Sequence, residues 1–434
     1  MTMNRYPSYK PTGVKWLGEI PSHWEVKHLR NFLTLFSEKG YGNSQLLSVT
    51  REKGVILRDK ENKEENHNFV PDDLSGYKHL EAGDFVINKM KSWQGSYGVS
   101  DYEGIVSPAY FTCKLHGVNP QFFSCAIRSK AYVGFFMQYS KGIRVDQWDL
   151  DPSSMKDIPF VLPSPEEQSA IAAYLDTATA KIDAAIAQQQ KMIDLLNERK
   201  QIIINRAVTK GLNPNAKMKD SGVEWIGEVP EGWEVRKLGA LGTTINGVSH
   251  DSTYFGSGYP FVSYSDVYKN YALPIKVEGL AKSSISERIF FSVQEGDVFF
   301  TRTSETVEEI GYASTCLKTI PDAVFAGFLI RFRPKAGFLD KNFSKYYFRA
   351  QIHRFYFVKE MNLVIRASLS QQLLKGLLVL LPPLTEQSAI ANYLDKKTFE
   401  IDNLINNYQN QISLLQERKQ IIINEVVTGK VKVV

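Results

Sequence analysis

One long segment of this chain of 434 residues occurs twice. Residues 162–209 (LPSPEEQSAIAAYLD…LLNERKQIIINRAVT) return as residues 381–428 (LPPLTEQSAIANYLD…LLQERKQIIINEVVT), and more than half of the aligned positions are identical. A shorter phrase, GVKWLGEIP followed by Trp24, returns as GVEWIGEVP followed by Trp233. The stretches between these phrases do not match continuously. Two near-identical frames with different inserts indicate that one scaffold carries two unlike domains.

The repeats divide the chain into four parts. The short phrase is displaced by 209 residues between its copies and the long phrase by 219, so the second insert is ten residues longer than the first. The polar join at residues 209–215 contains Gly and Pro, which suits a helix end and a linker. We therefore expect a domain at residues 1–161, a long helix at 162–211, a second domain at 212–380 and a second long helix at 381–434.

The long phrase predicts a helix. Ser164-Pro165-Glu166-Glu167 has the pattern of a capping box with proline at the first helical position. Apolar side chains recur with a heptad spacing in both copies, in an a/d series that includes Met192 and Arg199 in the first copy. About 40 residues at a rise of 1.5 Å form a rod of roughly 60 Å. Periodicity alone equally allows a helical hairpin or an oligomerisation coil. The presence of two matched copies in one chain favours their pairing with each other, and homodimer formation is the alternative.

The inserts have the pattern of small mixed α/β domains. Short apolar, β-branched and aromatic runs predict strands at residues 46–50, 84–88 and 110–115 of the first insert, and at 260–264, 297–301 and 328–332 of the second. One helix is predicted after each set, over residues 119–139 and 342–358. Because the order of elements agrees where the side chains do not, each insert is expected to be a copy of one domain.

Composition excludes several classes of protein. The chain has no long uninterrupted apolar stretch and no apolar signal region near Met1, so neither a membrane span nor export is expected. Three scattered cysteines fit reduced thiols in the cytoplasm. We find no phosphate-binding glycine loop, no HExxH motif and no cysteine and histidine cluster with zinc spacing, so no catalytic or metal-ligating residue is proposed. The net charge of +5 tolerates a nucleic-acid partner without indicating one.

A loop that occurs at the same place in both inserts is the main candidate for binding. Gly83-Asp84 and Gly296-Asp297 each precede a strand, and the loops after these strands differ in their side chains. Lysine, arginine, glutamine, serine and threonine are residues that contact phosphates and base edges of DNA. A second matched locus precedes each long helix. The candidate DNA-binding residues of the two loops and of the second locus are Lys89, Lys91, Trp93, Gln94, Arg302, Thr303 and Ser304, with Arg144 and Arg366. A solvated hairpin tip and surface ion pairs remain alternatives.

The phrases LPxxxEQxxIAxYLD and LLxERKQxIIN, with GVxWxGxxPxxWEV before each insert, resemble those of the specificity subunit of type I restriction–modification systems. The resemblance covers essentially the whole chain. It implies two target-recognition domains, each reading half of a split sequence in double-stranded DNA, and two antiparallel coiled-coil helices related by a pseudo-twofold repeat. The implied fold class is mixed α+β.

The resemblance also implies partners. Two modification (adenine methyltransferase) subunits would dock on the long helices, and restriction subunits with a motor and a nuclease would complete the complex. S-adenosylmethionine, ATP and Mg²⁺ would belong to those partners, and this chain would carry no cofactor and be cytoplasmic. Polar positions away from the a/d seam, Glu198, Lys200, Glu417 and Lys419, are the predicted partner contacts, unless they are simply solvated. A coiled-coil scaffold that does not bind DNA sequence-specifically, and an enzyme without recognisable motifs, are the competing hypotheses.

Overall fold

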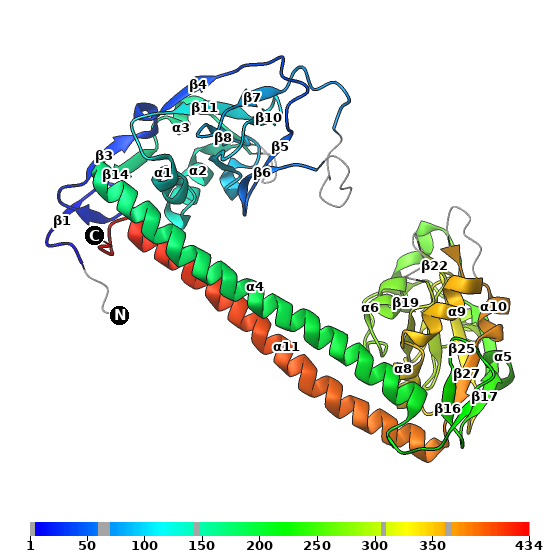
Figure 1. Ribbon diagram of the computed structural model, residues 1–434. Helices are drawn as coiled ribbons and strands as arrows, with labels where there is room; N and C mark the ends of the chain where they lie inside the picture. Colours follow the sequence, from blue (N-terminus) through cyan, green and yellow to red (C-terminus); the bar gives the residue numbers. More distant parts are fainter. Residues whose placement is uncertain (1–4, 60–69, 143–147, 305–309, 361–366, 434) are drawn as a thin grey trace. The chain divides into compact units, whose positions relative to one another are not determined.

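The computed structural model describes residues 5–59, 70–142, 148–304, 310–360 and 367–433. The chain divides into two compact units, each built from one insert and half of each long helix (Figure 1). Unit 1 contains Met1–Gln190 and Asn410–Val434, and unit 2 contains Lys191–Gln409. This division cuts both long helices in the middle, whereas the predicted boundaries follow the ends of the repeats.

Unit 1 begins with one short antiparallel pair of strands, and a second pair joins the two sides of the first insert. Its strands are β1 (Tyr9–Pro11), β2 (Glu19–Pro21), β3 (Glu25–His28), β4 (Leu33–Phe36), β5 (Leu47–Thr50), β6 (Gly54–Leu57), β7 (Lys78–Leu80), β8 (Phe85–Ile87), β9 (Tyr97–Val99), β10 (Gly104–Val106), β11 (Phe111–Leu115), β12 (Ser140–Lys141), β13 (Asp149–Leu150) and β14 (Pro159–Leu162). Its helices are η1 (Leu29–Asn31), η2 (Ser92–Gln94), α1 (Pro120–Ile127), α2 (Lys130–Tyr139) and α3 (Pro152–Met155), followed by the long α4 (Pro165–Lys210).

Unit 2 repeats this order with additional elements in the second insert. Its strands are β15 (Met218–Asp220), β16 (Glu228–Pro230), β17 (Glu234–Lys237), β18 (Gly242–Asn246), β19 (Phe255–Val262), β20 (Leu280–Ala281), β21 (Val298–Thr301), β22 (Thr303–Ser304), β23 (Ala313–Thr315), β24 (Val324–Phe325), β25 (Leu329–Pro334), β26 (Ala367–Ser368) and β27 (Leu378–Leu381). Its helices are α5 (Leu238–Leu241), η4 (Ser252–Tyr254), α6 (Tyr264–Lys269), α7 (Ile285–Phe290), α8 (Lys341–Tyr347), α9 (Ile352–Glu360), α10 (Gln371–Gly376) and the long α11 (Leu384–Val427).

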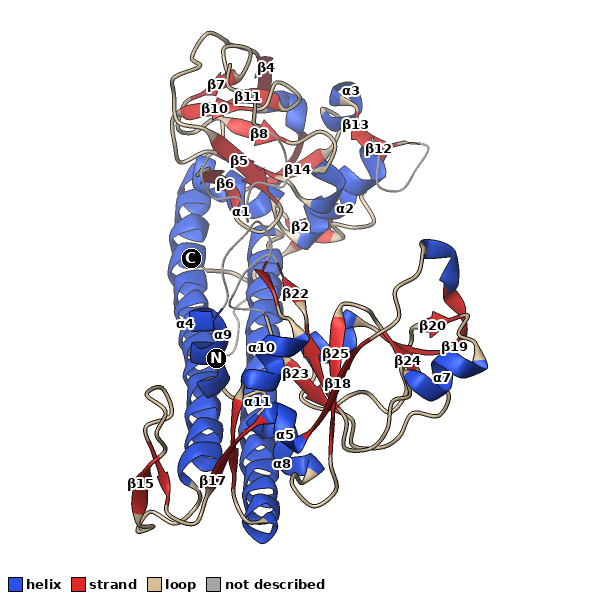
Figure 2. Cartoon of the chain, turned by 90° about the vertical axis from the view of Figure 1, so that its right-hand side faces the viewer, coloured by secondary structure: helices blue, strands red, loops and turns tan. Residues whose placement is uncertain are grey.

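The two inserts share one sheet topology, as the order of predicted strands suggested. A four-stranded antiparallel sheet has the order β4-β11-β8-β9 in unit 1 and β18-β25-β21-β23 in unit 2. Figure 2 shows β4, β11 and β8 of the first sheet and β18, β25 and β23 of the second. In each unit a further antiparallel pair, β3 with β14 or β17 with β27, joins the repeated phrases on either side of the insert. The predicted strands at residues 84–88, 110–115, 297–301 and 328–332 all lie in the two four-stranded sheets.

The prediction of a single helix in each insert is wrong, because each predicted range contains two helices. Residues 119–139 form α1 and α2, and residues 342–358 fall within α8 and α9. Asn119 caps α1 and Asp340 caps α8 through side-chain bonds to backbone N–H groups. Ser129 then adopts an extended backbone and begins α2, which changes the helix direction. Apolar periodicity continues across such a break, and the sequence pattern therefore did not show it.

The long phrases form continuous antiparallel helices. In unit 1 the first half of α4 pairs with the second half of α11, and the Lys419 ammonium lies 2.7 Å from the Asp183 carboxylate. In unit 2 the second half of α4 pairs with the first half of α11, with Lys200 2.7 Å from Asp402. The repeat places these two ion pairs at equivalent positions. The predicted fold, with two mixed α/β domains and a pair of long antiparallel coiled-coil helices, is confirmed.

The heptad assignment is wrong near the middle of each long helix. Ile193 is buried with 5% of its surface exposed, whereas Met192, which the heptad placed in the seam, is 36% exposed. In α11, Ile405 is buried and Leu404 is exposed. A straight α-helix drifts about 20° per heptad relative to a repeat of 3.5 residues, so the buried face moves by one residue over several turns.

The repeated phrases meet where the long helices enter the domain cores. We call this contact the helix-end seat: Trp24, Glu167, Gln168 and Gly429 in unit 1, and Trp233, Glu386, Gln387 and Gly211 in unit 2. Each buried tryptophan donates its indole N–H to the glutamate, at 3.3 Å in unit 1 and 3.0 Å in unit 2. Each glutamine side chain donates to the carbonyl of the proline before its helix, and its oxygen accepts from the backbone N–H of the residue that caps α1 or α8.

Two glycines complete the seats. Gly211 ends α4 with a φ of +71°, and a Cβ there would lie 2.7 Å from the Glu386 carboxylate and 3.4 Å from the Trp233 ring. Gly429 ends α11 with a φ of +73°, and a Cβ there would lie 3.0 Å from the Trp24 ring. Left-handed backbone and close approach together require glycine at both positions. Each domain core therefore includes the start of one long helix and the end of the other.

Because Ile193 is buried and Met192 is exposed, substitutions at these two neighbouring positions should lower the stability of the chain by different amounts. We expect Ile193→Ala to lower the free energy of unfolding by about 2 kcal/mol, because it removes a buried side chain. The matched control, Met192→Ala, should lower it by less than about 0.5 kcal/mol. Urea unfolding followed by circular dichroism measures both values. Equal costs, or a larger cost for Met192→Ala, would contradict the seam described above.

Candidate nucleic-acid interface

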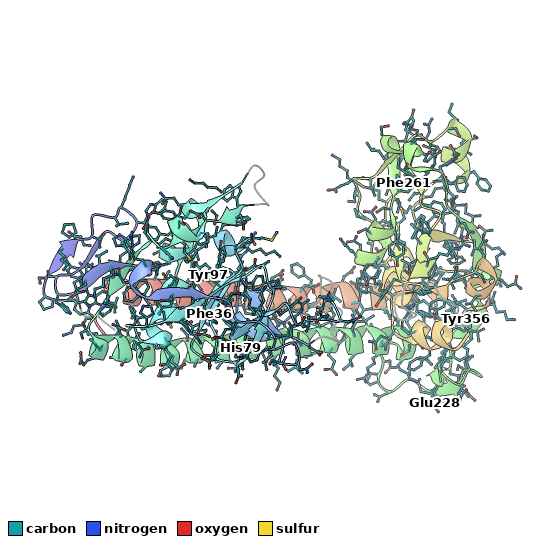
Figure 3. All side chains as sticks on the ribbon, turned by 90° about the horizontal axis from the view of Figure 1, so that it is seen from above. Phe36, His79, Tyr97, Glu228, Phe261 and Tyr356 are labelled. Atoms are coloured by element: carbon teal, nitrogen blue, oxygen red, sulfur yellow. The ribbon has the colours of Figure 1, made fainter. Side chains whose placement is uncertain are left out.

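The loop predicted to bind DNA in unit 1 is folded against its own domain. It joins β8 to β9 over residues 88–96 and contains η2, which ends at Gly95 with a φ of +96°. Its base is closed by the bond from the Asn88 N–H to the Ser96 carbonyl. Tyr97, at the start of β9, is fully buried in the core of unit 1 (Figure 3). The loop thus projects from a rigid part of the sheet.

The candidate side chains in this loop have different environments. Lys91 is exposed and Gln94 is half-buried. The Lys89 ammonium is held 2.8 Å from the Asp149 carboxylate. Trp93 lies against Trp148, with 5.4 Å between ring centroids, and its buried indole N–H has no acceptor among the described residues. Lys91 and Gln94 are therefore the side chains of this loop most available to a ligand.

The second predicted locus lies beside this loop. Strand β12 pairs with β13, and the Leu150 N–H donates to the Lys89 carbonyl at 3.1 Å. The hydroxyls of Ser92 and Ser140 are 3.3 Å apart. Arg144 lies outside the described residues, but the strands that flank it are placed. The structure therefore brings the two loci of unit 1 together, although they are far apart in the sequence.

Unit 2 connects its two loci in the same way. The Leu369 N–H donates to the Arg302 carbonyl at 2.7 Å, which matches the bond between Leu150 and Lys89. Strand β22, with Thr303 and Ser304, pairs with β26. Arg302 is half-buried, and its Nε atom has no acceptor in the part of the chain that the structure describes. Arg366 lies outside the described residues.

The predicted partner contacts on the long helices separate into two pairs. Lys200 and Lys419 face the other long helix, in the ion pairs with Asp402 and Asp183. Glu198 and Glu417 are exposed. Each exposed glutamate lies three residues after one exposed apolar side chain and four before another: Leu195 and Ile202 on α4, and Leu414 and Ile421 on α11. This apolar stripe, the same in both copies, was not predicted from the heptad pattern.

Neither a metal-ligand cluster nor a membrane-spanning helix occurs in the described part of the chain. Among the described residues there is no group of three or more histidine, cysteine, aspartate or glutamate side chains that could hold a metal ion. None of the helices in that part of the chain combines the length and apolar character that a membrane span requires.

Comparisons with known proteins agree with this architecture. The family model for the type I restriction modification DNA specificity domain matches residues 230–414. The chain is 22% identical to the EcoKI type I restriction enzyme specificity subunit of Escherichia coli, over 95% of this chain and 90% of that one. It is also 22% identical to the StySPI type I restriction enzyme specificity subunit of Salmonella potsdam, with the same coverage. A chain from a solved type I restriction–modification structure, described as addressing complex assembly and conformational transition, superposes with a TM-score of 0.66 at 16% identity, over 94% of this chain and 98% of that one.

Residues 230–414 thus match the type I restriction modification DNA specificity domain, and nearly the whole chain is similar to two type I restriction enzyme specificity subunits. The two inserts differ between the repeats of this chain, whereas the helix-end seats stay the same.

The sequence patterns also did not predict a partly buried arginine in each insert. Arg128 and Arg349 follow the N-caps Asn119 and Asp340 by the same number of residues, a signal that aligning the two caps would have shown. The Arg128 guanidinium donates to the carbonyls of Arg51, Glu52 and Tyr97. The Arg349 guanidinium donates to the carbonyls of Val267, Tyr268, Asn270 and Ala313. Burial lowers the pKa of both arginines below the usual value.

These arginines stabilise the strand that follows each candidate loop. Tyr97 begins β9 and Ala313 begins β23, and in each unit one arginine joins that strand to a segment from elsewhere in the insert. In unit 2, Arg354 adds a hydrogen bond to the Ile310 carbonyl, and burial lowers its pKa to about 10. In each unit a guanidinium donates to several backbone carbonyls, and those around Arg349 are partly buried, where a carbonyl without a donor is costly.

We expect Arg349→Met to lower the free energy of unfolding by about 2–4 kcal/mol, because it leaves partly buried carbonyl oxygens without this donor. Arg236→Met is the control, since the Arg236 side chain is exposed and pairs with Glu234 on the surface. Its effect should stay within about 0.5 kcal/mol. Thermal unfolding of the purified chains provides the measurement. An Arg349→Met protein as stable as its parent would contradict the role of this cation.

Proposed function

We propose that this chain is the non-catalytic DNA-recognition subunit of a type I restriction–modification complex. It reads a bipartite target in double-stranded DNA, one half with each insert, and positions the modification and restriction subunits. The observation that supports this proposal most strongly is that the two repeats share their backbone framework and differ in their loop side chains. Both inserts have the same sheet, the same seat and the same backbone bond between their two loci, whereas the side chains of the loops differ.

The chemistry of the loops supports DNA as the ligand. Lys91 and Gln94 in unit 1 offer a cation for phosphate or guanine and an amide that can make two bonds to adenine. Arg302 and Thr303 in unit 2 offer a guanidinium and a hydroxyl. Two readers of one duplex work together when their half-sites are about 34 Å apart, or a multiple of this. We propose that the long helices set this distance, since 46 residues of α-helix extend for about 69 Å.

The apolar stripes support a partner that binds twice. Leu195 and Ile202 on α4, and Leu414 and Ile421 on α11, are exposed at equivalent positions of the repeat. Ile202 also lines a cleft of about 670 Å³ in unit 2, together with Tyr393 of α11. Exposed apolar surface on a helix commonly marks a contact with another protein. We propose that each stripe, with Glu198 or Glu417 at its centre, binds one modification subunit.

The remaining roles belong to the partner subunits. In this proposal the modification subunits bind S-adenosylmethionine and methylate adenine, and the restriction subunits bind ATP and Mg²⁺. The specificity subunit contributes the DNA contacts and the assembly surface, and the complex acts in the cytoplasm. Lys200 and Lys419 support the assembly surface indirectly, because they hold the two long helices in register.

An exchange of one insert tests whether each insert reads one half of the DNA target. Residues 31–157 of unit 1 would be replaced by the matching insert of another specificity subunit, which leaves the β3–β14 pair and the seat in place. We expect the methylated sequence to change in one half only, because each insert reads separately. Sequencing of methylated adenine in cells that carry the complete system measures this.

The reciprocal exchange of residues 239–376 is the control, because it keeps β17 and β27 and should change the other half. An exchange that alters both halves, or neither, would contradict the proposal. A chain that acts only as a scaffold would leave the methylated sequence unchanged in both exchanges.

Charged substitutions in the stripes test the partner surface. We expect Ile202→Lys to reduce the modification subunits bound per chain from two to one, and Ile202→Lys with Ile421→Lys to abolish stable binding. Each substitution should weaken its own contact by about tenfold or more, because a cation replaces an apolar contact. Native mass spectrometry of the reconstituted complex reports the stoichiometry. Ile289→Lys, on the exposed face of α7, is the control and should bind two subunits. Loss of binding by this control, or none by the double variant, would refute the assignment.

A further inference from the structure

An exposed phenylalanine lies beside the candidate DNA loop of unit 2. Phe328 is 63% exposed and occupies the turn between β24 and β25. The Arg302 N–H donates to the Phe328 carbonyl at 2.9 Å. The residue that carries the exposed ring is therefore hydrogen-bonded through its backbone to Arg302, the first candidate residue of the loop.

The turn that carries Phe328 is rigid. The Leu329 N–H donates to the Ala326 carbonyl at 3.0 Å, and both flanking residues are buried in the core. A Cβ at Gly327 would lie 2.9 Å from the Val248 carbonyl, so the turn lies tightly against the neighbouring segment. The exposure of Phe328 is thus fixed by ordered backbone.

The matched position of unit 1 is also exposed but carries a different side chain. Phe111 pairs with Ile87 in unit 1, and Ile330 pairs with Phe300 in unit 2, so the strand registers match Phe328 to Ala109. Ala109 is exposed. The fold therefore exposes this position in both units, and only unit 2 places an aromatic side chain there.

We propose that Phe328 is a specificity-determining residue that contacts the 5-methyl group of a thymine in the half-site read by unit 2. This inference rests on the proposed function. Phenylalanine makes apolar contacts with the thymine methyl group in the major groove, where the other three bases present no such group. Arg302 and Thr303 beside it supply polar contacts to phosphate or to adjacent base edges. The backbone bond between Arg302 and Phe328 keeps these residues side by side.

The test removes single methyl groups from the DNA. The complex of the full chain with its modification subunits is titrated with duplexes in which each thymine of the half-site, on either strand, is replaced by uracil. With the parent chain we expect one replacement to weaken binding roughly fourfold, as the loss of one buried methyl group implies. With Phe328→Ala, thymine and uracil duplexes should bind equally at that position. Phe328→Leu should keep part of the preference, because leucine is still apolar.

Phe290→Ala is the matched control, since Phe290 is exposed to a similar degree on α7 of the same unit. It should preserve the fourfold preference. The inference is overturned if no uracil replacement weakens binding to the parent chain, if Phe328→Ala keeps the preference, or if Phe328→Ala weakens all duplexes equally or prevents assembly with the modification subunits. If the parent complex binds no duplex sequence-specifically, the proposed function itself fails.

Discussion

The architecture depends on the burial of all four ends of the two long helices in the cores of the domains. Glu167 and Glu386 accept the indole N–H groups of Trp24 and Trp233, and the buried tryptophans fix where each helix begins. In each unit, Gly211 or Gly429 ends the other long helix next to the same tryptophan ring. Removing a buried tryptophan typically costs about 3–5 kcal/mol. Because these contacts lie in the repeated phrases, the inserts can differ without loss of the frame.

The ion pairs between the long helices contribute specificity more than stability. Asp402 and Asp183 are about half exposed, and pairs of this kind contribute little to the free energy of folding. A lysine in a helix seam nevertheless disfavours other registers, in which it would be buried without a partner. Lys200 and Lys419 occupy equivalent positions in the repeat, so the same constraint acts once in each unit. The antiparallel alignment is thereby defined along both halves of the pair.

The side chains that we propose to contact DNA are separate from the backbone bonds that hold their loops in place. Leu150 bonds to the Lys89 carbonyl, and Leu369 to the Arg302 carbonyl, through backbone atoms that any residue supplies. Arg128 and Arg349 likewise bind backbone carbonyls rather than the loop side chains. Side chains such as Lys91, Gln94 and Phe328 are thus free to vary while the loop keeps its place. In the proposed function, this division lets one fold carry loops for different DNA sequences.

Much of the fold was determined by the sequence alone, because repeats, caps and apolar periods are local properties. The capping box at Ser164 and Glu167 forms as predicted, and the strands around Gly83-Asp84 and Gly296-Asp297 lie in matching sheets. Tertiary structure decided which side of a helix is buried, since a drift of about 20° per heptad moved Ile193 inward and Met192 outward. It also decided that Lys200 faces Asp402, and that Phe328 lies beside Arg302. These contacts join residues far apart in the chain, and their geometry depends on packing that no local pattern records.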